Sequence, residues 1–120
     1  MKKILLVDDS SSLRIAVRQA LTEAGYEVVE AEDGQHALSL LDGRRFHLII
    51  TDINMPKMDG FELMEAVRAE PAFRGTPILV LSTEFSDEKK MRAREAGATG
   101  WITKPFDPAK LGAAIRRVCS

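Results

Sequence analysis

The amino-acid sequence predicts an α/β fold, a three-layer sandwich of five βα units around a parallel sheet. Short β-branched or leucine-rich runs alternate with stretches of helical periodicity along the chain, which is typical of repeated βα units. Glycine, proline and capping residues separate the two kinds of segment. With 120 residues and 45% hydrophobic composition, the chain suits one compact core and is too short for two ordinary domains. We therefore expect residues 1–120 to form a single domain.

Five apolar runs are the predicted strands. The first, third and fourth are continuously apolar, as expected for strands that helices cover on both faces, whereas the second and fifth also carry polar residues. We therefore place the second and fifth runs at the edges of the sheet. The strand order 2-1-3-4-5 satisfies this condition and is the flavodoxin-like arrangement. In chain order the runs are residues 4–7, 27–31, 48–50, 78–81 and 101–103.

The segments between the strands have apolar residues at helical spacing, which predicts helices that pack on the sheet. Gly25 follows the first apolar stripe and Gly97 follows the fourth, at positions where helices commonly end. Asp107 offers an N-cap for the last helix, with Pro108 in its first turn. The fourth helix, around residues 87–96, is densely charged, so we expect weak anchoring that suits a movable element. The residues it can bury are Met91, Ala93 and Ala96.

The charge balance and the cysteine content exclude several classes of function. Lys and Arg total 17 against 18 Asp and Glu, so no net electrostatic bias toward nucleic acid or anionic membranes is present. Cys119 is the only cysteine, which excludes an internal disulfide and a cysteine-rich metal site. The apolar run at residues 4–7 is too short for a signal peptide or a membrane segment. We expect a soluble, cytoplasmic protein that binds neither nucleic acid nor membranes.

Polar side chains stand where four of the predicted strands end. Asp8 and Asp9 follow the first strand, and Asp52 follows the third. Ser82 follows the fourth strand and Lys104 the fifth. In an open parallel α/β sheet the ligand crevice lies beyond the carboxyl ends of the strands, where the strand order reverses. We therefore expect three carboxylates, a hydroxyl and an ammonium to lie together at this end of the sheet.

The three carboxylates need a positive partner. Each pair repels by about 4 kcal/mol at a separation of about 4 Å and an effective dielectric constant near 20. Mg²⁺ suits an all-oxygen donor set and commonly combines one or two carboxylates with water and phosphate oxygens. With Mg²⁺ and Lys104 offsetting the negative charge, one carboxylate can attack phosphorus and form an aspartyl phosphate.

Each of these residues, taken singly, also has an ordinary structural interpretation. Asp8 and Asp9 can cap a helix, Asp52 can be a turn aspartate before Pro56, and Lys104 can be a surface lysine. Their arrival at consecutive strand ends is what favours a functional site.

At these positions the chain resembles the receiver domains of two-component response regulators, and the resemblance covers essentially its whole length. Each motif alone is weak, but the ordered set is specific. The motifs are Asp8-Asp9, Asp52-Ile53-Asn54-Met55-Pro56 with Met58-Asp59-Gly60, Ser82, and Lys104-Pro105-Phe106.

The resemblance implies the role of each residue at the metal site. Asp52 would be the phosphoacceptor. Asp9 and Asp52 would bind Mg²⁺ through their carboxylates, and Asn54 would contribute its backbone carbonyl. Asp8 would assist, often through a water molecule.

The resemblance also implies how the signal is made and ended. Lys104 and Ser82 would hold the phosphoryl oxygens, and the Lys104–Pro105 peptide bond is expected to be cis. Trp101 occupies the position of an aromatic switch that rotates inward as Ser82 moves, although it is bulkier than the tyrosine or phenylalanine often found there. Asn54 and Glu84 would flank the path of an attacking water and tune dephosphorylation, which implies a short-lived signal.

Residues 84–106 look like those of CheY-like chemotaxis receivers, which act without an attached output module. This likeness implies a stand-alone, monomeric response regulator that takes its phosphoryl group from a histidine kinase and docks to a target such as the flagellar motor switch. Its docking face would be the fourth helix, fifth strand and fifth helix. Such a protein is a switch that catalyses only its own phosphotransfer and dephosphorylation.

One alternative stays open, and the residues argue against two others. A phosphorelay or other single-domain receiver would share every motif above. A haloacid-dehalogenase-like phosphatase also uses an aspartate nucleophile with Mg²⁺, but it would want a second aspartate where Asn54 stands and a cap insertion. A flavodoxin-like electron carrier shares the sheet order, yet Asp8 and Asp9 replace its phosphate-binding loop and would repel a flavin phosphate.

Overall fold

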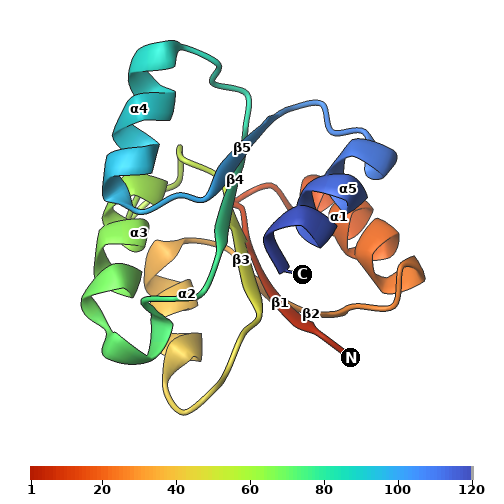
Figure 1. Ribbon diagram of the computed structural model, residues 1–120, viewed down its shortest axis with the longest axis horizontal. Coiled ribbons are helices and arrows are strands. Elements are labelled where there is room, and N and C mark those ends of the chain that lie inside the picture. Colours follow the sequence, from red (N-terminus) through yellow and green to blue (C-terminus); the bar gives the residue numbers. More distant parts are fainter. Residues whose placement is uncertain (120) are drawn as a thin grey trace.

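A computed structural model describes residues 1–119 and has three layers, with a parallel five-stranded sheet between two layers of helices. Helices α1 and α5 cover one face of the sheet, and α2, α3 and α4 cover the other (Figure 1). The strands are β1 (Lys3–Val7), β2 (Glu27–Ala31), β3 (Leu48–Thr51), β4 (Ile78–Ser82) and β5 (Gly100–Thr103). The helices are α1 (Ser11–Glu23), α2 (Gly34–Leu41), α3 (Gly60–Ala69), α4 (Asp87–Ala96) and α5 (Pro108–Cys119), with a short 3₁₀ turn at Pro71–Phe73.

The strand order is β2-β1-β3-β4-β5, which confirms the predicted flavodoxin-like arrangement. All five predicted runs are strands, and the second matches its predicted bounds. The inner strands β3 and β4 are buried at every residue, whereas the edge strand β5 has no fully buried residue. Polar residues in the second and fifth runs therefore mark the edges, because only these strands have one unpaired side.

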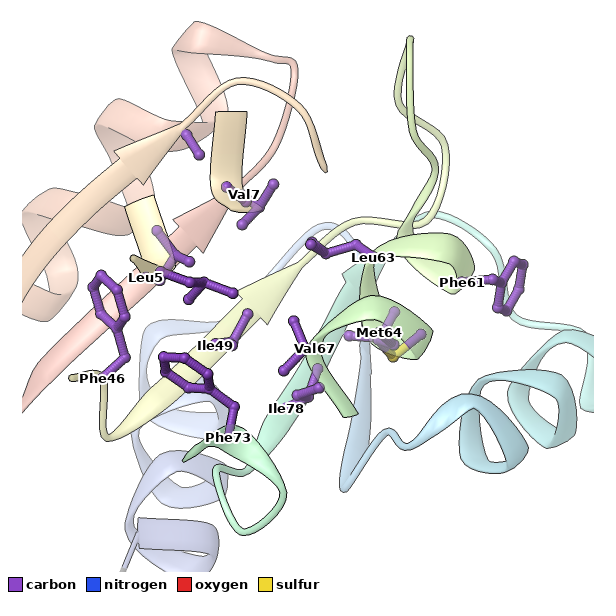
Figure 2. Packing of buried hydrophobic residues seen from close by; sticks show 14 of the residues in the cluster. Leu5, Val7, Phe46, Ile49, Phe61, Leu63, Met64, Val67, Phe73 and Ile78 are labelled. Carbon is purple, nitrogen blue, oxygen red and sulfur yellow. The ribbon is translucent and has the colours of Figure 1, made fainter. Parts of the chain in front are cut away.

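Alternate residues of the inner strands enter two separate cores. Leu5, Val7 and Ile49 face α2 and α3 in the larger cluster (Figure 2). Their neighbours Ile4 and Leu6 face α1 and α5 on the opposite side. This division follows from the two-residue period of a strand, and burying one such side chain contributes about 1.5–3 kcal/mol.

Side-chain caps begin the helices that border the carboxyl end of the sheet. Ser10 accepts a hydrogen bond from the Leu13 N–H at the start of α1, as expected of a serine N-cap. Pro108 is the first residue of α5, as predicted, and Asp107 accepts a hydrogen bond from the Ala109 N–H. Gly97 ends α4 with a φ of 118°, a left-handed conformation that favours glycine.

Helix α4 is anchored less by burial than by contacts at its C-terminal end. Ala93 is its one buried residue, whereas Met91 is 63% exposed, so the prediction that Met91 is buried is wrong. Arg92 lies over the Phe61 ring of α3, 4.0 Å from its centroid. Arg68 of α3 donates two hydrogen bonds to the Gly97 carbonyl at the end of α4. Among residues 1–119 no helix combines the length and the apolar character needed to cross a membrane.

Candidate functional site

Three aspartates meet at the carboxyl ends of β1 and β3, as the topology predicts. Carboxylate oxygens of Asp8, Asp9 and Asp52 all lie within 4.8 Å of one another. Asp8 and Asp52 are only 1% and 8% exposed, whereas Asp9 is exposed to solvent. The set therefore has a buried floor made by two carboxylates and a third carboxylate at the surface.

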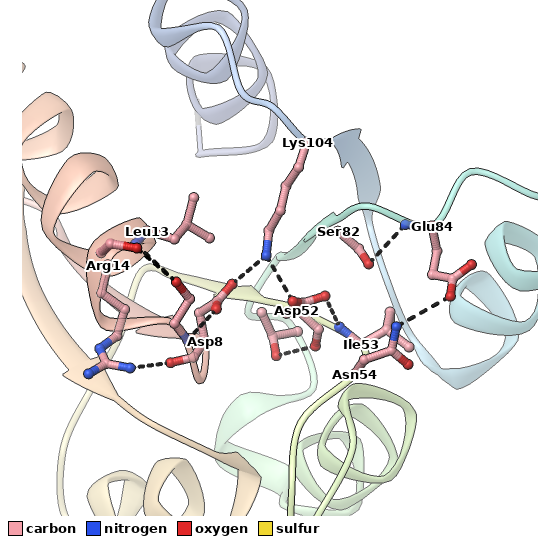
Figure 3. Close-up of polar contacts among 12 residues, drawn as sticks. Asp8, Leu13, Arg14, Asp52, Ile53, Asn54, Ser82, Glu84 and Lys104 are labelled. Atoms are coloured by element: carbon pink, nitrogen blue, oxygen red, sulfur yellow. Dashed lines mark hydrogen bonds and ion pairs between the residues drawn. The ribbon is translucent and has the colours of Figure 1, made fainter.

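Lys104 joins the two buried carboxylates. Its ammonium lies 2.8 Å from Oδ2 of Asp8 and 2.8 Å from Oδ2 of Asp52 (Figure 3). Its backbone N–H donates to the Ser82 carbonyl at 2.8 Å, which fixes Lys104 beside the end of β4. The Lys104–Pro105 peptide bond is cis, as predicted.

The burial of these charges shifts their pKa values. Burial raises the pKa of Asp8, and this effect exceeds the lowering by the Lys104 hydrogen bond. Burial by itself would lower the pKa of Lys104, but hydrogen bonds with Asp52 and Asp8 raise it overall. Lys104 is therefore a permanent cation at neutral pH.

The two buried carboxylates are held through both of their oxygens. Oδ1 of Asp8 accepts a hydrogen bond from the Ser10 N–H at 2.8 Å, and Oδ1 of Asp52 accepts one from the Ile53 N–H at 2.6 Å. With Oδ2 of each on Lys104, their rotation is restricted and the exposed Asp9 side chain completes the set. Three carboxylates against one ammonium leave a net negative charge, and this hard oxygen donor set fits Mg²⁺.

The remaining predicted residues form a second group around Glu84. The buried Ser82 hydroxyl accepts a hydrogen bond from the Glu84 N–H at 3.3 Å. The Asn54 side-chain amide donates to Glu84 Oε1 at 3.3 Å, and Lys89 Nζ lies 3.3 Å from the same oxygen. Asn54 and Glu84, which the sequence places 30 residues apart, are thus in direct contact.

Trp101 is connected to the same group. It lies half-buried on β5, and its indole N–H donates to the Glu84 carbonyl at 3.0 Å. The predicted switch residues Ser82 and Trp101 are therefore linked through one intervening residue, because Glu84 bonds to both of them. Phenylalanine could not make this link, since its ring has no hydrogen-bond donor.

Sequence reasoning missed two residues that shape the site. Arg14 of α1 donates a hydrogen bond to the Asp8 backbone carbonyl (Figure 3). Gly60 packs so closely under Asp52 that an added Cβ would lie 2.2 Å from the Asp52 carbonyl oxygen. The motif that contains Gly60 was recognised, but the packing reason for it was not visible in sequence. Arg14 belongs to no recognised sequence motif. Its role becomes visible only in the structure, where it pairs with a residue of β2.

Known proteins resemble this chain over nearly its whole length. The family model of the response regulator receiver domain matches residues 4–116. The chain is 36% identical over 117 residues to the chemotaxis protein CheY of Pseudomonas aeruginosa PAO1, covering 97% of this chain and 94% of that protein.

Solved structures also match nearly the whole chain. The chemotaxis protein CheY4 of Vibrio cholerae has a TM-score of 0.95 and 50% sequence identity, with 98% of each chain covered. The receiver domain of the sensor histidine kinase PA1611 from Pseudomonas aeruginosa PAO1 has a TM-score of 0.91 at 28% identity, covering 99% of this chain and 98% of that one. That structure has a magnesium ion coordinated in its active site cleft.

Proposed function

This chain belongs to the response-regulator receiver family and is CheY-like, and we propose that Asp52 is the residue on which it is phosphorylated. The observation that carries the proposal is the position of the Asp52 carboxylate. It lies beside two further carboxylates and 2.8 Å from the Lys104 ammonium, at the end of the central strand β3. A histidine kinase supplies the phosphoryl group, and a downstream protein reads the result.

The phosphorylation step is a displacement at phosphorus. A carboxylate oxygen of Asp52 forms a bond to phosphorus as the bond from phosphorus to the kinase histidine nitrogen breaks. Lys104 binds a phosphoryl oxygen and balances its charge. Asp9, Asp52 and the Asn54 backbone carbonyl would hold Mg²⁺, with Asp8 acting through water, and the bound ion would supply further positive charge.

The output begins at Ser82. Its hydroxyl turns from the Glu84 N–H toward the new phosphoryl group, which frees the Glu84 peptide to move. Trp101 follows because its indole is bonded to the Glu84 carbonyl, and the surface made by α4, β5 and α5 changes for a partner. The Asn54 and Glu84 side chains flank the approach of the water that ends the signal.

The relatives named CheY support a role in chemotaxis. Within that role we propose the flagellar motor switch as the docking target. In this role residues 1–120 act as one monomeric domain in the cytoplasm. The protein catalyses its own phosphotransfer and dephosphorylation and turns over no separate substrate.

A small acyl phosphate with Mg²⁺ tests the phosphoacceptor. Intact-protein mass spectrometry should find one added phosphoryl group on the wild type and none on Asp52→Asn. Asp42→Asn is the matched control, because Asp42 is an exposed aspartate at the end of α2. This variant should still gain one phosphoryl group, as the wild type does. Phosphorylation that survives Asp52→Asn, or none on the wild type, would overturn the proposal.

A further inference from the structure

Arg14 connects helix α1 to the metal site through the protein backbone. Its Nη1 donates to the backbone carbonyl of Asp8, and its Nε donates to Glu30 Oε1 on β2 at 3.1 Å. The Arg14 side chain is only 16% exposed. We infer that Arg14 is a positioning residue that sets the direction of Asp9 for the bound cation, an inference that rests on the proposed Mg²⁺ site.

Glu30 supports Arg14 from the opposite side. Its second carboxylate oxygen lies 2.6 Å from Arg18, so both oxygens of Glu30 are occupied by arginines of α1. Arg18 is 55% exposed, while Arg14 points toward Asp8. The guanidinium of Arg14 is thus held at one end by Glu30 and holds the Asp8 carbonyl at the other, which its planar donor geometry allows.

The Asp8 carbonyl belongs to the peptide bond that leads into Asp9. The Asp8 N–H already donates to the Ala31 carbonyl at 3.1 Å, which ties the residue to β2. Since the peptide unit is planar, the hydrogen bond from Arg14 also fixes the plane from which the Asp9 backbone departs. Asp9 is the exposed carboxylate of the set. The orientation of its side chain therefore depends on this backbone rather than on surrounding side chains.

Charge and position have opposite effects on Mg²⁺ affinity here. Arg14 is a cation beside a cation site, so by charge alone its removal would strengthen Mg²⁺ binding. If Arg14 positions Asp9, removal of the Arg14 side chain must weaken Mg²⁺ binding. Mg²⁺ demands near-ideal octahedral geometry, so a misplaced ligand lowers its affinity. The direction of the change therefore distinguishes the two roles.

The test is a Mg²⁺ titration of the full-length protein followed by ¹⁵N–¹H NMR, with Arg14→Gln compared against Arg18→Gln. Both variants remove one positive charge from α1 and one partner of Glu30, but only Arg14 contacts Asp8. We expect Arg14→Gln to raise the Mg²⁺ dissociation constant about tenfold, as loss of an outer-shell partner commonly does, and Arg18→Gln to change it less than about twofold. In the metal-free protein, the Asp9 amide of Arg14→Gln should show increased mobility in ¹⁵N relaxation.

Arg14→Lys keeps the charge and removes the forked contact, so it should also weaken Mg²⁺ binding. Equal or tighter binding by Arg14→Gln, or full affinity in Arg14→Lys, would overturn the positioning role while the proposed function stands. Failure of the wild type to bind Mg²⁺ would instead overturn the metal site itself. The NMR spectrum of each variant reports whether it is folded, so unfolding cannot be mistaken for a weaker site.

Discussion

Lys104 Nζ and Asp52 Oδ2 are 2.8 Å apart, although 52 residues separate them in sequence. The ammonium is also 2.8 Å from Asp8, so a single side chain after β5 compensates carboxylates from β1 and β3. In the proposed phosphorylation, the charge of the Asp52 carboxylate would be replaced by that of a phosphoryl group on the same side chain. Lys104 would then be a counterion in both states of the switch.

Replacing Lys104 with methionine should destabilise the metal-free protein. The two buried carboxylates lose their cation, and we expect the free energy of unfolding to fall by about 2 kcal/mol, less than for a fully buried pair. The same variant should bind Mg²⁺ more tightly, because a neighbouring positive charge is gone. Urea unfolding without metal and calorimetric Mg²⁺ titration measure the two effects.

Lys89→Met is the control for Lys104→Met. It breaks the more exposed ion pair with Glu84, which should cost less than about 1 kcal/mol. Equal losses of stability in the two variants would contradict a special compensating role for Lys104.

Replacing Asp8 with asparagine should stabilise the metal-free protein at neutral pH. Burial raises the pKa of Asp8 in the folded state above its ordinary value of 3.8, so the folded state binds its proton more tightly than the unfolded state. The contribution of Asp8 to the free energy of unfolding therefore falls as pH rises from 3.8 through the folded pKa. At pH 7 the ionised Asp8 still destabilises the folded state. We expect Asp8→Asn to be more stable at pH 7 by about 1 kcal/mol.

The pH dependence separates this explanation from others. The advantage of Asp8→Asn should shrink as pH falls through the folded pKa toward 3.8 and should vanish well below 3.8, where Asp8 is protonated in both the folded and the unfolded state. Thermal unfolding across this pH range measures it. Lower stability of Asp8→Asn at pH 7 would mean that the ion pair with Lys104 outweighs the effect of burial.

The sequence predicted those parts of the site that strand order alone brings together. Asp8, Asp52 and Lys104 each follow a strand, and parallel strands end at the same edge, so their meeting needed no knowledge of side-chain direction. The Asn54–Glu84 contact was anticipated only as a shared location, because the geometry of two loops is not encoded in periodicity. The exposure of Met91 was missed because, among the apolar residues of α4, only Ala93 and Ala96 pack against the core, and helical spacing in a short charged helix does not show which residues do so.

Replacing Trp101 with phenylalanine should loosen the loop between β4 and α4. The ring remains large enough to pack, but the Glu84 carbonyl loses its indole donor. We expect a loss of about 1 kcal/mol in stability, as for one hydrogen bond, and faster amide hydrogen exchange at Glu84 and Phe85. Phe85→Leu, at a residue that is 73% exposed, should leave stability nearly unchanged. Unaltered exchange in Trp101→Phe would show that the indole does not restrain the loop.

Gly60→Ala should be the most damaging of these substitutions. The added Cβ would lie 2.2 Å from the Asp52 carbonyl oxygen and 2.8 Å from the Ile53 Cα, both backbone atoms that cannot rotate away. The Gly60 N–H also donates to the Ile53 carbonyl at 2.8 Å. This hydrogen bond holds the start of α3 against the segment after β3, so α3 cannot move away from the added Cβ without breaking it. We expect the free energy of unfolding to fall by about 3 kcal/mol or more, and phosphorylation by a small acyl phosphate to be slower, since Asp52 is displaced with its backbone.

Gly75→Ala is the matched control, because no neighbouring atom lies within 4 Å of its added Cβ. Its effect on the free energy of unfolding should stay within about 0.5 kcal/mol. If urea unfolding gives both variants the same midpoint, close packing of α3 beneath Asp52 is not what requires glycine at position 60.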